Sequence, residues 1–326
     1  MKPIGVALTG SHLLELLADP APVRALDGSG FAVAVAGIDR IGDSFPGRST
    51  VSAPGRRTIE STIAVTFLAE RAPRLGWLAA AAVHRDHPYN LARRVASLDH
   101  LARGRTGLAL GVRDWYAPDG GTVWGGAGLT EGVPIGAETA RGAAAAIRGL
   151  WQSWPADSIV ADRETGIYAR AERIRRIDHH DVFDVEGPLT VPTTRQGTPV
   201  LAWRVPEAAV GAEVPADVVI RPVDGALPAG YAPAVPLLAE IVDDGTRAAS
   251  LLADERVHGV LLRPGDTEDL ADFLDRAGAW LRTVPGAPVA AGGAWTLRER
   301  LALPAPAPLL ADARPAFRAP SPELAR

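Results

Sequence analysis

Short runs of consecutive apolar residues recur eight times along the chain, and this repetition limits the folds that it can adopt. Strands buried on both faces, as in a parallel sheet, are apolar at consecutive positions, whereas half-buried strands alternate. Helix-like segments separate most of the runs, which is the pattern of repeated βα units. The predicted strands cover residues 4–8, 31–38, 75–83, 107–112, 199–203, 217–220, 235–242 and 257–262. Eight parallel strands suit a closed barrel, so we predict an α/β fold of the (β/α)8 TIM-barrel class.

The segments between the strands predict most of the outer helices and two departures from a regular barrel. Helices are predicted over 11–17, 59–72, 90–100, 137–154 and 267–281, with Thr267 as the N-cap of the last and Glu268 and Asp269 in its first turn. A glycine-rich loop over 116–136 and a proline-punctuated stretch over 154–198 predict an insertion after strand 4 that folds over the barrel. Proline and glycine within 221–233 predict that one outer helix is lost.

Length and composition fit one large soluble domain. The chain has 326 residues, of which 47% are hydrophobic and 22% charged. We predict a single barrel domain over 1–303 and a proline-rich C-terminal tail over 304–326. The net charge of -4 gives no basic field for nucleic acid or a membrane surface, and the absence of cysteine excludes thiol chemistry. Without a long apolar run at Met1-Lys2-Pro3-Ile4, a cytoplasmic location is expected.

Polar residues that directly follow predicted strands are the candidate functional residues, because the active sites of TIM barrels lie at the carboxyl ends of their strands. Asp39 ends the second strand, Arg113 follows the fourth and Arg204 ends the fifth. The guanidinium forks of Arg113 and Arg204 suit the oxygens of a phosphate group. The alternative is that each arginine forms a salt bridge with a carboxylate of a neighbouring loop.

Two histidine-containing segments could hold a metal, but neither spacing favours it. In an extended His84-Arg85-Asp86-His87 segment, only His84 and Asp86 share a face, which leaves an incomplete set of ligands. A role for His84 as acid, base or hydrogen-bond donor is favoured over metal binding, and a polar loop without a role is the alternative. The segment 178–181 (DHHD) is predicted to be a solvated turn.

Four groups of segments resemble one family, in the same order along the chain from about residue 31 to 304. They are 87–100 (HPYNLARRVASLDH) with 104–105 (GR), 148–154 (RGLWQSW) with 159–163 (IVADR), 185–189 (VEGPL) with 196–200 (QGTPV), and 296–301 (TLRERL). The sequence is similar to the large flavin-using component of nitrilotriacetate, dibenzothiophene-sulfone and related monooxygenases. This group belongs to the bacterial-luciferase-like flavin monooxygenase superfamily.

The resemblance implies a luciferase-like TIM barrel that oxidises a small organic substrate with oxygen and reduced FMN, which a separate flavin reductase supplies. Asp39 matches an expected neighbour of the flavin. Elsewhere the family's flavin contacts are replaced: Val83 and His84 stand where it has small hydroxyl residues, and 203–207 (WRVPE) replaces the Gly-Ser loop that receives the phosphate. Losing several phosphate contacts at once predicts that FMN binds weakly, if at all.

Two classes of function are therefore open. In the first, the chain is an FMN-dependent monooxygenase with a rebuilt site, in which His84 is the catalytic residue and Asp39, Arg113 and Arg204 contact the cofactor. In the second, it is a non-catalytic luciferase-like barrel that binds another ligand or pairs with an active homologue.

A homodimer is expected, because luciferase-like barrels commonly pair through outer helices. The helix over 59–72 places Ile59, Ile63 and Thr66-Phe67 on one side. The alternative is that this stripe packs on the barrel, as some face of every outer helix must.

Overall fold

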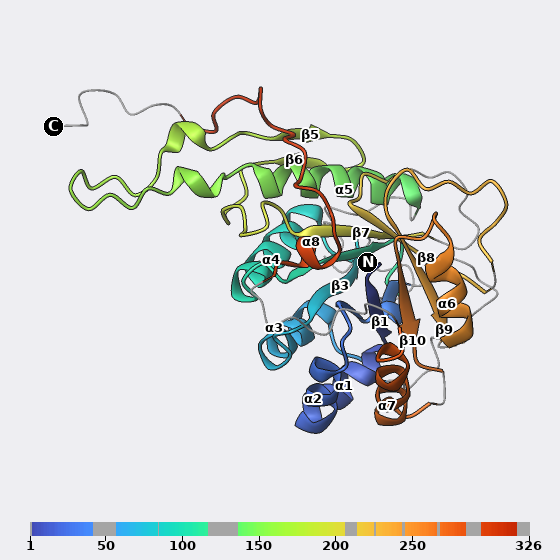
Figure 1. The fold of residues 1–326 in the computed structure, drawn as a ribbon. Coiled ribbons are helices and arrows are strands. Elements are labelled where there is room, and N and C mark those ends of the chain that lie inside the picture. Colours follow the sequence, from blue (N-terminus) through green and yellow to red (C-terminus); the bar gives the residue numbers. More distant parts are fainter. Residues whose placement is uncertain are drawn as a thin grey trace.

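The computed structural model is a closed eight-stranded parallel barrel (Figure 1). It describes residues 2–41, 57–83, 85–116, 136–205, 214–224, 226–242, 245–265, 268–284 and 295–317. Around the barrel the strands are ordered β1-β10-β9-β8-β7-β4-β3-β2, and every neighbouring pair is parallel. These strands are β1 (Ile4–Leu8), β2 (Val33–Ala36), β3 (Gly76–Ala82), β4 (Thr106–Gly111), β7 (Val200–Arg204), β8 (Val218–Pro222), β9 (Leu237–Val242) and β10 (Gly259–Arg263). The predicted barrel, with all eight of its strands, is confirmed.

The helices of the structure confirm the five predicted segments and add others. They are α1 (Gly10–Ala18), α2 (Pro20–Gly28), α3 (Ser61–Arg71), α4 (Pro88–Leu101), α5 (Ala137–Gln152), α6 (Gly245–Ala253), α7 (Leu270–Leu281) and α8 (Leu297–Arg300). The predicted N-cap of α7 is wrong: the cap is Asp269, whose side chain accepts from the backbone N–H of Ala271 at 2.8 Å. Between β8 and β9 the described residues contain no helix, so the predicted loss of an outer helix is confirmed there.

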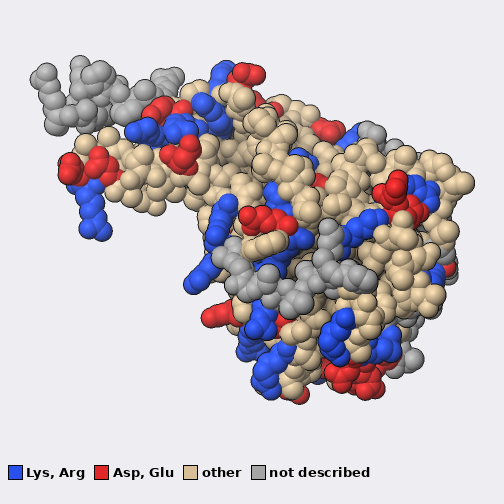
Figure 2. Space-filling view, in the orientation of Figure 1, with Lys and Arg blue, Asp and Glu red and all other residues tan. Residues whose placement is uncertain are grey.

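The insertion after β4 contains α5 and a segment that leaves the barrel and returns. The arm (residues 154–176) extends sideways from the barrel and carries both signs of charge (Figures 1 and 2). It leads into a two-stranded antiparallel sheet of β5 (Asp178–His180) and β6 (Asp184–Glu186), so segment 178–181 is mostly a strand and the predicted turn is wrong. Phe183 and Val185 pack with Ile147 and Leu150 of α5. The described part of the tail runs along the arm, where Ala316 N–H donates to Ile174 O at 2.7 Å.

The short helix α8 closes the amino end of the barrel. Its Leu297 and the following Leu301 are fully buried and belong to the apolar interior of the barrel. A Cβ atom at Gly76 would lie 2.5 Å from Leu297 Cδ1, and one at Gly107 would lie 3.1 Å from Leu297 Cδ2. These two strands therefore have glycine near their amino ends, where α8 approaches them closely.

Arg298 of α8 ties this closure to the barrel through a buried ion pair. Its Nη2 lies 3.2 Å from Asp217 Oδ2 and donates to Thr198 Oγ1 at 3.2 Å, while Nη1 donates to Pro304 O at 3.0 Å. Asp217 Oδ2 also accepts from Leu201 N–H at 2.9 Å. One guanidinium thus joins the segments that lead into β7 and β8 with the segment that leaves α8.

Gln196 extends this network to β4. Its Oε1 accepts from Arg298 N–H at 3.2 Å, and its Nε2 donates to Thr106 O at 2.7 Å and to Asp99 Oδ1 at 2.9 Å. Burial raises the pKa of the Asp99 carboxyl, which is fully enclosed and also accepts from Thr106 N–H at 2.9 Å. The amino end of the barrel is therefore held by polar groups that are buried and hydrogen-bonded.

The outer face of α3 carries large apolar side chains that do not pack on the barrel. Its inner face, with Ala64, Val65 and Leu68, is buried, but Ile63 and Phe67 are 52% and 53% exposed. Of the predicted stripe, Ile63, Thr66 and Phe67 are exposed, whereas Ile59 packs against the core. A helix that is apolar on both sides is normally covered on both sides, so this face is suited to a partner.

We expect Arg298→Met to lower the free energy of unfolding by about 3 kcal/mol, because it leaves the buried Asp217 carboxylate without its main partner. Chemical denaturation monitored by circular dichroism measures the change. Arg300→Met, in the same helix but only partly buried, is the matched control and should cost below about 1 kcal/mol. Equal losses in the two variants would contradict this role of Arg298.

The stability of the fold should also depend on the protonation of His87. This residue is the N-cap of α4: its Nδ1 accepts from Tyr89 N–H at 3.3 Å, and its ring meets that of Phe183 edge-on at 5.9 Å. Burial lowers the pKa of His87 below its ordinary value of 6.5. At a pH between the folded pKa and 6.5, the unfolded chain therefore binds more protons than the folded chain. The free energy of unfolding consequently falls as the pH falls from 6.5 through the folded pKa.

His87→Asn keeps a side-chain cap but removes the titrating group. We expect the free energy of unfolding of this variant to fall less on acidification, by about 1.4 kcal/mol for each unit by which the folded pKa is lowered. Denaturant titrations at a series of pH values measure this difference. The control is His180→Asn, because hydrogen bonding to Asp184 raises the pKa of the exposed His180. The free energy of unfolding of His180→Asn should fall on acidification at least as much as that of the parent. If the free energy of unfolding of His87→Asn falls as steeply as that of the parent, the prediction is rejected.

Candidate functional site

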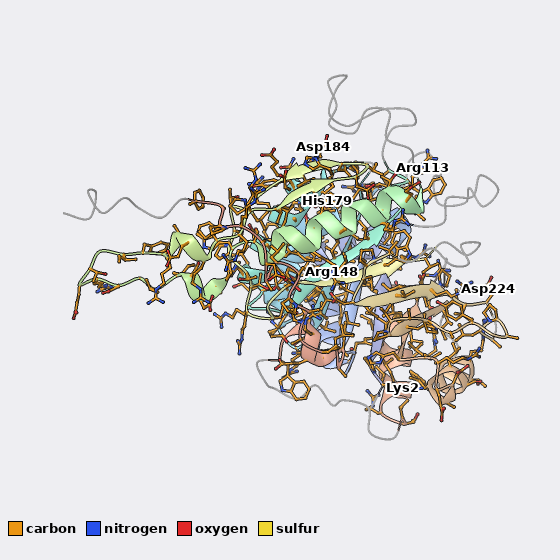
Figure 3. All side chains as sticks on the ribbon, turned by 90° about the horizontal axis from the view of Figure 1, so that it is seen from above. Lys2, Arg113, Arg148, His179, Asp184 and Asp224 are labelled. Carbon is orange, nitrogen blue, oxygen red and sulfur yellow. The ribbon has the colours of Figure 1, made fainter. Side chains whose placement is uncertain are left out.

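The carboxyl ends of the eight strands form the mouth of the barrel, and three of the four predicted site residues lie there. Asp39 follows β2, Arg113 follows β4 and Arg204 is the last residue of β7. Because all eight strands are parallel, these positions share one end of the barrel. Figure 3 shows Arg113 at the end opposite Lys2, which precedes β1. His84, the predicted catalytic residue, lies outside the described residues.

Asp39 is held by two hydrogen bonds from neighbouring segments. It belongs to the short 3-10 helix η1 (Ile38–Ile41), directly after β2. Its Oδ1 accepts from Gly10 N–H, at the start of α1, at 2.9 Å, and its Oδ2 accepts from Tyr116 OH at 2.7 Å. The carboxylate therefore links the loops that follow β1, β2 and β4. Both oxygens are engaged within the protein.

A buried ion pair between Arg40 and Asp114 lies beside Asp39. The Nη2 of Arg40 is 2.7 Å from Asp114 Oδ2, and each side chain is only 3% exposed. Arg85 Nη1 approaches the same oxygen at 3.3 Å, and Tyr116 N–H donates to Oδ1 at 2.9 Å. The Arg40 guanidinium also lies 5.1 Å from the centre of the Tyr116 ring. Sequence reasoning did not identify this pair, whose two residues are 74 positions apart in the chain.

Arg113, which follows β4, stacks on an aromatic neighbour. Its guanidinium lies over the ring of its neighbour Trp115, at 4.9 Å from the ring centre. Stacking on an indole leaves the edge of a guanidinium able to donate hydrogen bonds. The hydrogen bonds that hold the Asp39 carboxylate come from Gly10 and Tyr116.

Arg204 forms the second buried ion pair of the mouth, with Glu240 of β9. Its Nε donates to Glu240 Oε2 at 3.0 Å and its Nη2 to Oε1 at 3.4 Å, so the carboxylate is held by a fork of two N–H groups. The third nitrogen, Nη1, donates to Ile41 O at 3.2 Å. Arg263 of β10 lies 3.9 Å from Glu240 Oε1. The carboxylate is thus placed between two arginines and is only 4% exposed.

Sequence reasoning missed Glu240, although the sequence holds a signal for it. Glu240 is the only charged residue of the apolar run over 235–242. A charged residue inside a strand that is buried on both faces needs a partner of opposite charge. Arg204, which ends another strand of the same barrel, meets that need.

Apolar side chains of η1 fill the space next to this ion pair. Ile38 and Ile41 are buried and pack among the interior residues of the barrel. A Cβ atom at Gly111, the last residue of β4, would lie 2.4 Å from Ile41 Cβ. The chain has therefore placed a branched side chain directly against the glycine that ends β4.

The described residues of the mouth do not fit FMN. The flavin ring needs an open apolar slot and its phosphate needs free donors. Here Ile41 takes the space beside Gly111, and the fork of Arg204 is directed at Glu240. Nor do the described residues contain a group of three or more side chains suited to a metal ion. Asp86, for example, forms an ion pair with Arg94 at 2.7 Å.

Comparison with known proteins gives a relative that matches along most of its length. This relative, a component of pristinamycin IIA synthase from Streptomyces pristinaespiralis, is 33% identical over 278 residues, which cover 84% of this chain and 87% of that protein. Dibenzothiophene-sulfone monooxygenase from Rhodococcus erythropolis is 29% identical over 168 residues, which cover 50% of this chain and 36% of that protein. No family model matches the chain.

The solved structures agree on the fold. EDTA monooxygenase from Chelativorans sp. BNC1 superimposes with a TM-score of 0.67 and 15% identity, covering 93% of this chain and 98% of that one. No helix among the described residues has the length and apolar character needed to cross a membrane. Together with the match to the synthase component, these comparisons show that the chain belongs to the luciferase-like flavin monooxygenases.

Proposed function

We propose that this chain is a subunit of a two-component, FMN-dependent monooxygenase. Such an enzyme oxidises a small organic substrate with oxygen and with reduced flavin from a separate reductase. Membership of the family supports this chemistry, and the relative matched over most of its length is itself named as one subunit of a synthase. The family chemistry needs neither a cysteine nor a metal, and the sequence has no cysteine.

The observation that carries the proposal of a subunit role is how the described residues fill the mouth. Arg204, Glu240 and Ile41 occupy the end of the barrel where a TIM-barrel ligand would enter. A barrel of this kind can keep its fold and its partner while another barrel holds the flavin. The chain then corresponds to the second class of function, a luciferase-like barrel that pairs with an active homologue.

A second candidate is that the chain itself holds FMN and performs the oxidation. The position of Asp39, at the mouth and next to β2, favours this function. It would use His84 as the catalytic group and Arg113 or Arg204 as the anchor of the phosphate. For Arg204 this requires the fork to exchange the Glu240 carboxylate for the phosphate.

Deleting the gene from its source strain tests the proposed chemistry. We expect loss of a metabolite that incorporates isotopically labelled oxygen gas, measured by mass spectrometry, and accumulation of a precursor that is one oxygen atom lighter. Complementation with the unchanged gene should restore the product. A labelled metabolite profile that is identical with and without the gene would reject a role in a monooxygenase.

Pairing is proposed to use the outer face of α3. Alone in solution, the chain can offer this face only to a second copy, so we expect a homodimer by light scattering at micromolar concentration. In the assembled enzyme, the same face would receive the flavin-binding barrel. Burying Ile63 and Phe67, now 52% and 53% exposed, stabilises the pair by the hydrophobic effect.

Phe67→Arg should shift the mass to that of a monomer, because it places an unpaired charge in the interface. The matched control is Ile167→Arg on the arm, since Ile167 is 49% exposed and lies away from α3. This control should leave the mass unchanged. A parent protein that is monomeric, or a control that dissociates as readily as Phe67→Arg, would refute pairing through α3.

A further inference from the structure

The mouth of the barrel contains an anion of its own. The resemblance assigns the phosphate to segment 203–207, which begins at the end of β7, and TIM barrels in general often bind phosphate where the seventh and eighth strands end. Here these strands are β9 and β10, and they supply Glu240 and Arg263. With Arg204 from β7, the Glu240 carboxylate has one arginine bound to it side-on at 3.0 and 3.4 Å and a second at 3.9 Å. Two arginines around one anionic group are what a phosphate would need at this place.

We propose that the Glu240 carboxylate is a built-in anion that closes this site, so that the chain takes up neither phosphate nor FMN at its mouth. This inference rests on the proposed function. If the chain is one subunit of the enzyme and binds no FMN, the flavin is held by the barrel of another subunit. Glu240 therefore defines which subunit lacks the cofactor.

The closure is favoured because the carboxylate is attached to the barrel. A phosphate in solution loses translational and rotational freedom when it binds, whereas Glu240 is already held beside the arginines by β9. Displacing it would also leave a buried carboxylate without a partner, since it is only 4% exposed. An external anion would have to overcome both costs.

Arg204 connects the ion pair to the apolar filling of the mouth. Its Nη1 donates to Ile41 O at 3.2 Å, and Ile41 lies against Gly111. Redirecting Arg204 toward a ligand would therefore break one of the contacts that hold η1 over β4. The polar and apolar parts of the closure depend on the same side chain.

Two measurements on the full chain test the proposal. In equilibrium dialysis, the unchanged protein should retain no FMN above the buffer level at about 100 μM ligand, a concentration that would reveal any site with a Kd in the micromolar range. In thermal unfolding, inorganic phosphate should leave the Tm of the unchanged protein within the shift that a chloride control gives. Glu240→Gln removes the internal charge and keeps the side-chain size, so we expect phosphate to raise the Tm of that variant by about 2 °C or more over chloride.

A double variant, Arg204→Met with Glu240→Leu, removes the arginine fork and its anion together, and phosphate should have no specific effect on it. Stoichiometric FMN bound to the unchanged protein would overturn the proposal. If phosphate changes the Tm of the unchanged protein, of Glu240→Gln and of the double variant by the same amount, the proposal is overturned as well. If Glu240→Gln does not fold, dialysis of the unchanged protein still decides. FMN binding together with loss of the oxygenated product on gene deletion would reject this closure and leave the monooxygenase role intact.

Discussion

The buried contact between Arg298 and Asp217 is the interaction on which the placement of the residues at the mouth depends. It joins α8, which follows all eight strands in the chain, to the segments that enter β7 and β8. Through Gln196 it also reaches Thr106, the first residue of β4. A parallel barrel has no hairpins to fix the register of its strands, so their order and tilt depend on contacts at their ends and on the helices. Once the amino end is closed in this way, the opposite ends of the strands, and the side chains that leave them, have fixed positions.

Small side chains in the barrel interior explain how the mouth can be filled from within. Ala80, Ala82, Ala109 and Ala202 line the interior, and Gly111 ends β4. These positions leave volume that the chain recovers with Ile41 from η1 and with the long side chain of Arg204. The arginine brings a charge into an enclosed space, which costs several kcal/mol unless an opposite charge and further hydrogen bonds accompany it. Glu240 and the carbonyl oxygen of Ile41 supply both, so the apolar and ionic parts of the mouth are mutually dependent.

The architecture could be predicted from the sequence because the eight strands are buried on both faces, and their apolar runs are interrupted at the points where the strands end. Elements that depend on tertiary contacts were harder to predict. The short helix α8 is stabilised by the burial of Leu297 and Leu301 and not by its own length, and β5 exists because it pairs with β6. At the mouth, strand ends identified Asp39, Arg113 and Arg204. Their partners could not be identified in the same way, since Glu240 is 36 positions from Arg204 and Asp114 is 74 from Arg40. Only closure of the barrel brings these residues together.

Residues that resemble the family and residues that differ from it lie at opposite ends of this barrel. Several segments that carry the resemblance lie in the network at the amino end: Gln196, Arg298 and Asp99 are among them. Positions at which the resemblance implies replaced flavin contacts, Val83 and Arg204 among them, lie at the carboxyl ends of β3 and β7. In a TIM barrel the amino end serves stability and the carboxyl end serves chemistry, so the second can change without loss of the first. A chain that keeps the Arg298 network therefore keeps the fold and the outer face of α3. It can serve as a partner barrel whether or not its own mouth still admits a ligand.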